Sequence, residues 1–123
     1  YFVPGQANQV HYVPVGTNHQ EEITWPDYAA MTRTVERRNI LESAVMNPHE
    51  HYDTMVHKFL APPLYNTAYE KAFGTLYTAA YLPKSNTVHY YWPGKQLTQS
   101  IEDFKPGKMG ITLRTNAQRK VAL

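Results

Sequence analysis

The sequence predicts an α+β fold in which antiparallel strands form a sheet that is covered on both faces. A strand-turn-strand pattern runs from Gly74 to Trp92, and a pattern of helical period runs from Thr34 to Met46. Both faces of the predicted hairpin carry bulky side chains, whereas a sheet with one wet face alternates cleanly between apolar and polar residues. We therefore expect this sheet to pack on a second sheet and also on helices at its outer face.

Length and composition indicate a soluble protein with one domain, residues 1–123, that ends in a basic tail at 114–123. Hydrophobic residues make up 42% of the chain and charged residues 18%, which excludes a disordered chain. No stretch approaches the roughly 20 apolar residues of a membrane helix. The net charge of +2 is too small to indicate nucleic-acid binding. We expect neither a membrane nor a nucleic acid as a partner.

A strand is predicted from Gln9 to Val15, because this segment is short and rich in β-branched and aromatic residues. Pro14 places the strand near an edge or at its own end, since proline donates no hydrogen bond to a ladder. Gly16 then allows a sharp bend into the polar corner Thr17-Asn18-His19. The chain is expected to be irregular from there to Trp25-Pro26-Asp27.

The best predicted helix runs from Thr34, which we expect to cap it, to Met46. Asn47-Pro48 ends this helix, because the residue before a proline is biased away from helical geometry. At about 100° per residue, one stripe of the helix is apolar. Its members are Ile40, Leu41, Ala44 and Val45. Arg37 falls near the centre of this stripe, whereas Arg38 lies at its edge and four residues before Glu42.

A second helix is predicted from Tyr52 to Leu60, and the hairpin follows with its turn at Pro83–Asn86. Further short strands are expected near Gln99–Phe104 and Gly110–Leu113. The ten tyrosines suit sheet surfaces, interfaces and binding clefts, because each combines an apolar body with a hydroxyl. The chain has no cysteine, which excludes disulfides, thiolate metal sites and a cysteine nucleophile within these residues.

Three sequence features resemble the penicillin acyl-transferase and choloylglycine hydrolase group of linear amide hydrolases. The corner Thr17-Asn18-His19 after a strand resembles that group's "TNH" or "TN" motif, and Thr34-Val35-Glu36-Arg37 resembles its Ser/Thr-x-x-Arg helix start. The hairpin start Gly74–Ala79, together with the turn Trp92-Pro93-Gly94, is similar to the terminal hairpin of the acyl-transferase branch. The resemblance extends over most of the chain, from Val10 to Phe104.

The resemblance implies the αββα sandwich of the N-terminal-nucleophile hydrolases, of which this chain would be the C-terminal part. In such enzymes an N-terminal cysteine attacks an amide carbonyl and its own α-amine is the general base. That cysteine is missing here and Tyr1 is no substitute, so we expect these residues to be inactive alone. The implied partners are the nucleophile-bearing segment or chain and a small amide or acyl substrate. No cofactor is implied, and an exposed inner face favours a homo-oligomer.

Asn18 and Arg37 are the candidate catalytic residues. An amide N–H fixed at a tight corner can donate to the oxyanion that forms during amide cleavage. The alternative for Asn18 is a plain turn residue. A guanidinium on the apolar stripe of a helix requires a partner, either a structural carboxylate or the catalytic cleft. Arg38 and Glu42 are expected to form a surface ion pair.

His19, Tyr65 and Tyr77 are the candidate substrate-binding residues, with a structural histidine and core tyrosines as the alternatives. No metal site is predicted, because His49, His51 and His57 lack the spacing of helical zinc ligands. A different class of function also fits the sequence. In that hypothesis the chain is a non-catalytic β-rich binding or assembly module that uses its aromatic surface for a partner.

Overall fold

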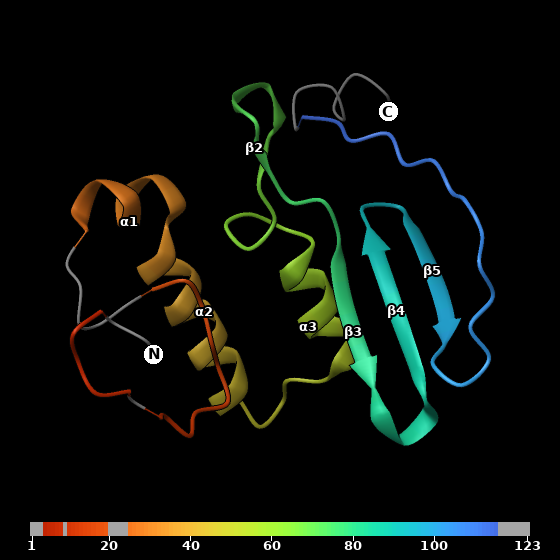
Figure 1. Ribbon diagram of the computed structural model, residues 1–123, viewed down its shortest axis with the longest axis horizontal. Coiled ribbons are helices and arrows are strands. Elements are labelled where there is room, and N and C mark those ends of the chain that lie inside the picture. Colours follow the sequence, from red (N-terminus) through yellow and green to blue (C-terminus); the bar gives the residue numbers. More distant parts are fainter. Residues whose placement is uncertain (1–3, 9, 20–24, 116–123) are drawn as a thin grey trace. The chain divides into compact units, whose positions relative to one another are not determined.

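The computed structural model describes residues 4–8, 10–19 and 25–115, and Figure 1 shows their arrangement along the chain. The chain divides into two compact units, Tyr1–His51 and Tyr52–Leu123, and each is described by itself. The described residues form a small α+β protein with three α-helices and two antiparallel sheets. The predicted α+β class is therefore confirmed at this level of detail.

The first unit contains α1, Pro26–Thr32, and α2, Thr34–Met46. Between them Arg33 adopts left-handed geometry (φ 54°), which ends α1 and starts α2 in a new direction. The predicted irregular path through Pro26 was wrong, because α1 begins there. Proline is favourable at a first helical position, where its missing N–H has no intrahelical acceptor to lose.

The predicted bounds of α2 are confirmed, but the predicted cap is wrong. Arg33 occupies the N-cap position and no side chain caps the helix. Thr34 instead lies inside the first turn with 1% of its surface exposed. Leu41 and Ala44, in the middle of the predicted stripe, are buried, whereas Val45 at its margin is 43% exposed. The burial of α2 therefore follows the centre of the predicted stripe.

The predicted strand Gln9–Val15 is wrong for the residues that the structure describes, Val10–Val15; Gln9 lies outside them. Val10, Tyr12 and Val13 are 75%, 96% and 63% exposed. Strand propensity reflects packing against cross-strand neighbours, and no strand in the described part of the chain pairs with this segment. The β-branched pattern alone was therefore misleading.

The second unit begins with α3, Tyr52–Phe59, one residue shorter than predicted. A small antiparallel pair follows, β1, Thr67–Ala68, with β2, Phe73–Gly74. The main sheet has the order β3-β4-β5. Its strands are β3, Thr78–Leu82, β4, Thr87–Trp92, and β5, Lys95–Ser100.

The predicted hairpin is confirmed from Thr78 to Trp92, whereas its predicted start is wrong, because residues 75–77 form no strand and Gly74 belongs to β2. Thr78 lies opposite Tyr91, and Leu82 lies opposite Thr87. A 3-10 turn at Pro83–Ser85 joins the strands, and Asn86 closes it in left-handed geometry (φ 50°). Asparagine tolerates this conformation better than most residues, which explains why this sequence makes the turn.

The last strand lies earlier than predicted. The predicted strands at Gln99–Phe104 and Gly110–Leu113 are wrong, because β5 ends at Ser100 and the described residues after it form no strand. Gly94 takes a positive φ of 76°, so the chain reverses immediately after β4. The polar segment Lys95–Ser100 then pairs with β4 along its whole length. Pairing with β4, rather than intrinsic propensity, makes this segment a strand.

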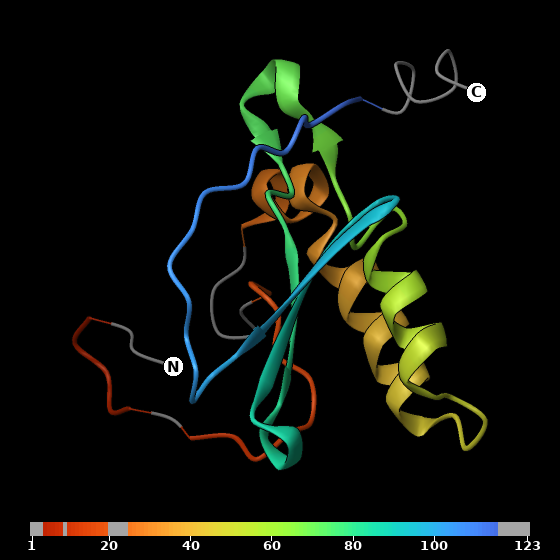
Figure 2. The same ribbon diagram turned by 90° about the vertical axis from the view of Figure 1, so that its right-hand side faces the viewer.

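The predicted burial of both sheet faces holds for β4 and fails for β5. Val88 and Tyr91 lie on opposite faces of β4 and are only 5% and 8% exposed. Residues Lys95–Thr98 of β5 are exposed. On one face, Thr78 Oγ1 donates to the carbonyl oxygen of Phe59 (3.3 Å), which ties β3 to the end of α3. Figure 2 shows α3 on one side of the sheet and the segment after β5 on the other.

Gly74→Ala is expected to lower the free energy of unfolding by about 1–3 kcal/mol, the usual cost of overpacking. A Cβ at Gly74 would lie 2.2 Å from the ring of Tyr69, whose hydroxyl donates to the carbonyl oxygen of Thr75 (2.7 Å). Urea denaturation measures the effect. Gly107→Ala is the matched control, because its Cβ meets nothing within 4 Å. Equal stabilities for the two variants would contradict this packing.

Candidate functional site

Two of the predicted site residues meet in the first unit. The guanidinium of Arg37, on α2, donates through Nη1 to Asn18 Oδ1 at 3.1 Å, across 19 positions of sequence. Asn18 Nδ2 in turn donates to the hydroxyl of Tyr28, on α1, at 2.9 Å. The amide of Asn18 is thus held at both its oxygen and its nitrogen. One N–H of the amide is used in these contacts, and an amide nitrogen carries two.

His19 is anchored beside this contact. Its backbone N–H donates to Thr17 Oγ1 (3.2 Å), a local turn that threonine commonly forms. Its ring Nδ1 lies 3.3 Å from Thr34 Oγ1, and Thr34 is buried in the first turn of α2. The polar corner is therefore attached to the start of α2, and Asn18 is presented to Arg37 one turn further along.

Arg37 makes no ion pair with a carboxylate in the described part of the chain. Its Nε is buried and has no hydrogen-bond partner among the described residues. Leaving a buried N–H without a partner costs about 1–3 kcal/mol. Among the described residues, the Arg37 side chain is held by its hydrogen bond to Asn18 and not by an ion pair. The neighbouring prediction is confirmed, since Arg38 Nε donates to Glu42 Oε1 at 2.7 Å.

A small cavity of about 40 Å³ adjoins the corner. Its lining residues are His11, Val13, Val15, Thr17, His19, Arg38 and Glu42. The predicted substrate contact His19 lines it, whereas Asn18 and Arg37 do not. The volume is enough for a water molecule and too small for an acyl chain.

The other predicted substrate-binding residues belong to the second unit. Tyr65 is buried, with 1% of its surface exposed, and packs as a core residue. Tyr77 is 53% exposed and contacts the ring of Tyr90 edge-on, with centroids 5.6 Å apart. Neither residue lines the larger cavity of the second unit.

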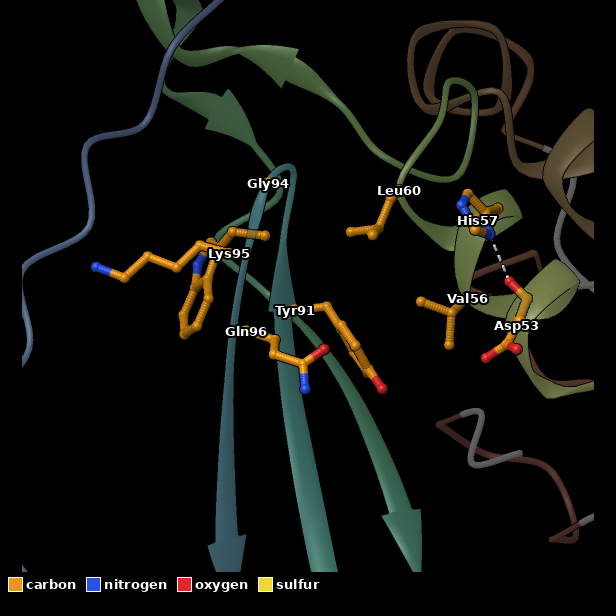
Figure 3. A pocket seen from close by; sticks show the side chains of 9 residues that line it. Asp53, Val56, His57, Leu60, Tyr91, Gly94, Lys95 and Gln96 are labelled. Carbon is orange, nitrogen blue, oxygen red and sulfur yellow. Dashed lines mark hydrogen bonds between the residues drawn. The ribbon is translucent and has the colours of Figure 1, made fainter.

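A larger cavity of about 400 Å³ lies in the second unit, between α3 and the β4–β5 turn (Figure 3). Its lining residues are Asp53, Val56, His57, Leu60, Tyr91, Trp92, Gly94, Lys95 and Gln96. Sequence reasoning missed this cavity. The available signal was the spacing of Asp53, Val56 and His57, at i, i+3 and i+4, which places these three residues on one face of α3.

Tyr91, which lines this cavity, belongs to a hydrogen-bonded group. The hydroxyls of Tyr52 and Tyr91 are 2.7 Å apart, and the Tyr91 hydroxyl is 3.2 Å from His89 Nδ1. Burial raises the pKa of Tyr91 to about 12, with further contributions from the Tyr52 hydrogen bond and from the charges of Tyr52 and Asp53. The group links α3 to β4 through polar atoms.

In the ranges 4–8, 10–19 and 25–115, no three side chains of the metal-binding types gather closely enough to hold an ion. None of the helices in these ranges is long and apolar enough to cross a membrane. Comparison of the chain with models of known families, with curated proteins and with solved structures finds no match.

Tyr91→Phe is expected to change how stability depends on pH above neutrality. The folded protein raises the pKa of Tyr91 from 10.0 to about 12, so the stabilisation is fully present below pH 10.0 and is lost as pH rises to about 12. The stability difference between wild type and Tyr91→Phe should therefore shrink across this window. Urea denaturation at a series of pH values measures it.

Tyr81→Phe is the matched control, because it removes a hydroxyl from a side chain that is 66% exposed on the same sheet. The control should follow the wild-type profile. If the Tyr91→Phe and wild-type profiles stay parallel from neutral pH to pH 12, the burial of the Tyr91 hydroxyl is contradicted.

Proposed function

We propose that this chain is part of an enzyme that cleaves linear amides or transfers their acyl groups. The observation that carries the proposal is the hydrogen bond between Arg37 and Asn18. The two residues were predicted from two separate sequence motifs, Asn18 from the polar corner Thr17-Asn18-His19 and Arg37 from the helix start Thr34-Val35-Glu36-Arg37. Their contact across 19 positions supports a common role and is not expected for a plain turn residue.

The proposed roles follow from the hydrogen bonds. Asn18 accepts from Arg37 through its oxygen, so its nitrogen is the end available to a developing negative charge. When a thiolate attacks an amide carbonyl, the carbonyl oxygen becomes an oxyanion, and the remaining N–H of Asn18 donates to it. Arg37 fixes the amide and adds a positive charge near the oxyanion. Arg37 is thus a positioning residue.

The rest of the reaction requires a cysteine that the 123 residues do not contain. In the proposal, a segment or chain outside Tyr1–Leu123 supplies it as an N-terminal residue, whose α-amine takes the thiol proton and delivers it to the leaving amine. Water or a second amine then takes the acyl group from sulfur. No cofactor is needed.

The finer fold in this proposal is the αββα sandwich, with the β3-β4-β5 sheet and α3 as part of its second half. A helix against one face of an antiparallel sheet is compatible with that architecture. His19, Tyr65 and Tyr77 remain proposed substrate-binding residues. The substrate class is a small linear amide or acyl compound.

A second candidate is the non-catalytic binding module, and one observation favours it. Leu76, Tyr77 and Tyr81, on and before β3, are 63%, 53% and 66% exposed. Exposed apolar side chains on an edge strand are typical of a surface that pairs with another chain. The coding region upstream of Tyr1 separates the candidates, since the enzyme needs a cysteine there or on a second chain.

In the complete natural gene product, Asn18→Ala is expected to lower kcat on N-acyl amides by about a hundredfold to a thousandfold, the usual effect of losing one oxyanion donor. Amine release across a panel of acyl chain lengths measures turnover. Asn39→Ala is the control, because Asn39 is exposed on the same helix that carries Arg37. Near wild-type turnover in a folded Asn18→Ala protein would remove this assignment, and an inactive natural product would contradict the enzyme itself.

Arg37→Lys is expected to lower kcat by about tenfold to a hundredfold with little change in KM, since a misplaced catalytic group weakens transition-state contacts. The lysine keeps the charge and loses the planar fork that orients Asn18. Arg38→Lys, one residue away, should leave kcat unchanged because its pair with Glu42 is on the surface. Equal effects of the two substitutions would argue against a positioning role for Arg37.

A further inference from the structure

We infer that the cavity between α3 and the β4–β5 turn binds a small organic cation, an amine that carries an apolar or aromatic body. This site lies wholly within the second unit, and the inference does not depend on the proposed amide chemistry.

The cavity has the size and walls of a ligand site. Its volume of about 400 Å³ lies within the range of about 300–1,000 Å³ that small-molecule pockets occupy. Val56 of α3, and Leu60 just after the end of α3, extend toward Tyr91 on β4 (Figure 3). Trp92 also borders the cavity, but it follows Tyr91 on β4, so its side chain points to the opposite face of the sheet, where the indole N–H donates to the carbonyl oxygen of Leu76 at 2.7 Å. The walls are therefore of mixed character, with the apolar side chains of Val56 and Leu60 opposite Tyr91 and polar side chains around them.

The charge available to a ligand in this cavity is negative. Asp53 lines the cavity and makes no ion pair within the described ranges. Lys95 also lines it, but its ammonium donates to the carbonyl oxygen of Gly110 at 3.3 Å and points away from the cavity in Figure 3. The Nδ1 atom of His57 is engaged with the carbonyl oxygen of Asp53 at 2.7 Å. The carboxylate is the charged group that remains for a ligand.

The aromatic ring of Tyr91 and the carboxylate of Asp53 line the same cavity and together favour a cation over other ligands. A positive group within about 6 Å of a tyrosine or tryptophan ring gains from the ring quadrupole, and the gain grows when water is excluded. An anionic ligand would be repelled by the exposed Asp53 carboxylate, and a neutral ligand would lack the attraction that a cation gains from it. The Tyr52–Tyr91 hydrogen bond holds the Tyr91 ring in place, so the site is rigid where the cation would contact it.

Binding of 2-phenylethylamine to the full chain, followed by nuclear magnetic resonance titration, tests the inference. The expected result is saturable binding with shifts concentrated at Val56, Leu60 and Gln96. Two probes of matched size, 2-phenylethanol and 3-phenylpropanoate, should bind at least about tenfold more weakly, because each lacks the cation that pairs with a carboxylate. Equal affinity for the three probes would overturn the inference, as would shifts that fall elsewhere.

Variants separate the carboxylate from general packing. Asp53→Asn should weaken phenylethylamine binding by about tenfold or more, whereas Asp103→Asn, an exposed carboxylate paired with Lys105 at 3.3 Å, should not change it. Asp53 also lies in the first turn of α3, where a negative charge stabilises a helix. Thermal melting therefore shows whether the Asp53→Asn protein still folds. Val56→Trp fills the cavity without changing charge and should abolish binding. Unchanged affinity in either cavity variant would refute the site.

Discussion

The pairing of β4 on both sides is the constraint on which the second unit depends. β4 forms ladders with β3 and β5, and it buries one large side chain on each face, Val88 and Tyr91. A strand buried on both faces must be matched by elements that cover it, and α3 does so on the Tyr91 side. The position of α3 follows from this requirement, and so does the cavity between α3 and the β4–β5 turn.

In the first unit, hydrogen bonds between polar side chains hold the corner and the two helices together. Asn18 contacts side chains from both helices, Tyr28 on α1 and Arg37 on α2. Arg33, in left-handed geometry between the helices, determines the direction in which α2 leaves. A short irregular corner can hold a side-chain amide in one orientation when both of its ends are bonded. This is the property that an oxyanion donor requires, because a preoriented donor needs no reorganisation as charge develops.

The two sites use charge in opposite ways. Around Asn18 the neighbouring charge is the guanidinium of Arg37, which suits a developing negative charge. Around Tyr91, burial is the main cause of the raised pKa of the phenol, and the neighbouring carboxylate of Asp53 adds a smaller contribution in the same direction. Each arrangement is defined within one unit of the chain. The proposed amide chemistry and the proposed cation site can therefore be tested separately.

The sequence by itself determined the elements whose signals are local. The helix Thr34–Met46 followed from its period, the hairpin around Pro83–Asn86 from its turn residues, and the Arg38–Glu42 pair from its spacing. Elements that need a distant segment to pair with formed only where the tertiary structure supplied that segment. Val10–Val15 remained unpaired despite its strand-like composition, and Lys95–Ser100 became a strand because β4 offered a free edge after the sharp turn at Gly94. The Arg37–Asn18 contact and the cavity beside Tyr91 are likewise products of packing, since hydrogen bonds and cavities between distant segments depend on distances that no local pattern encodes.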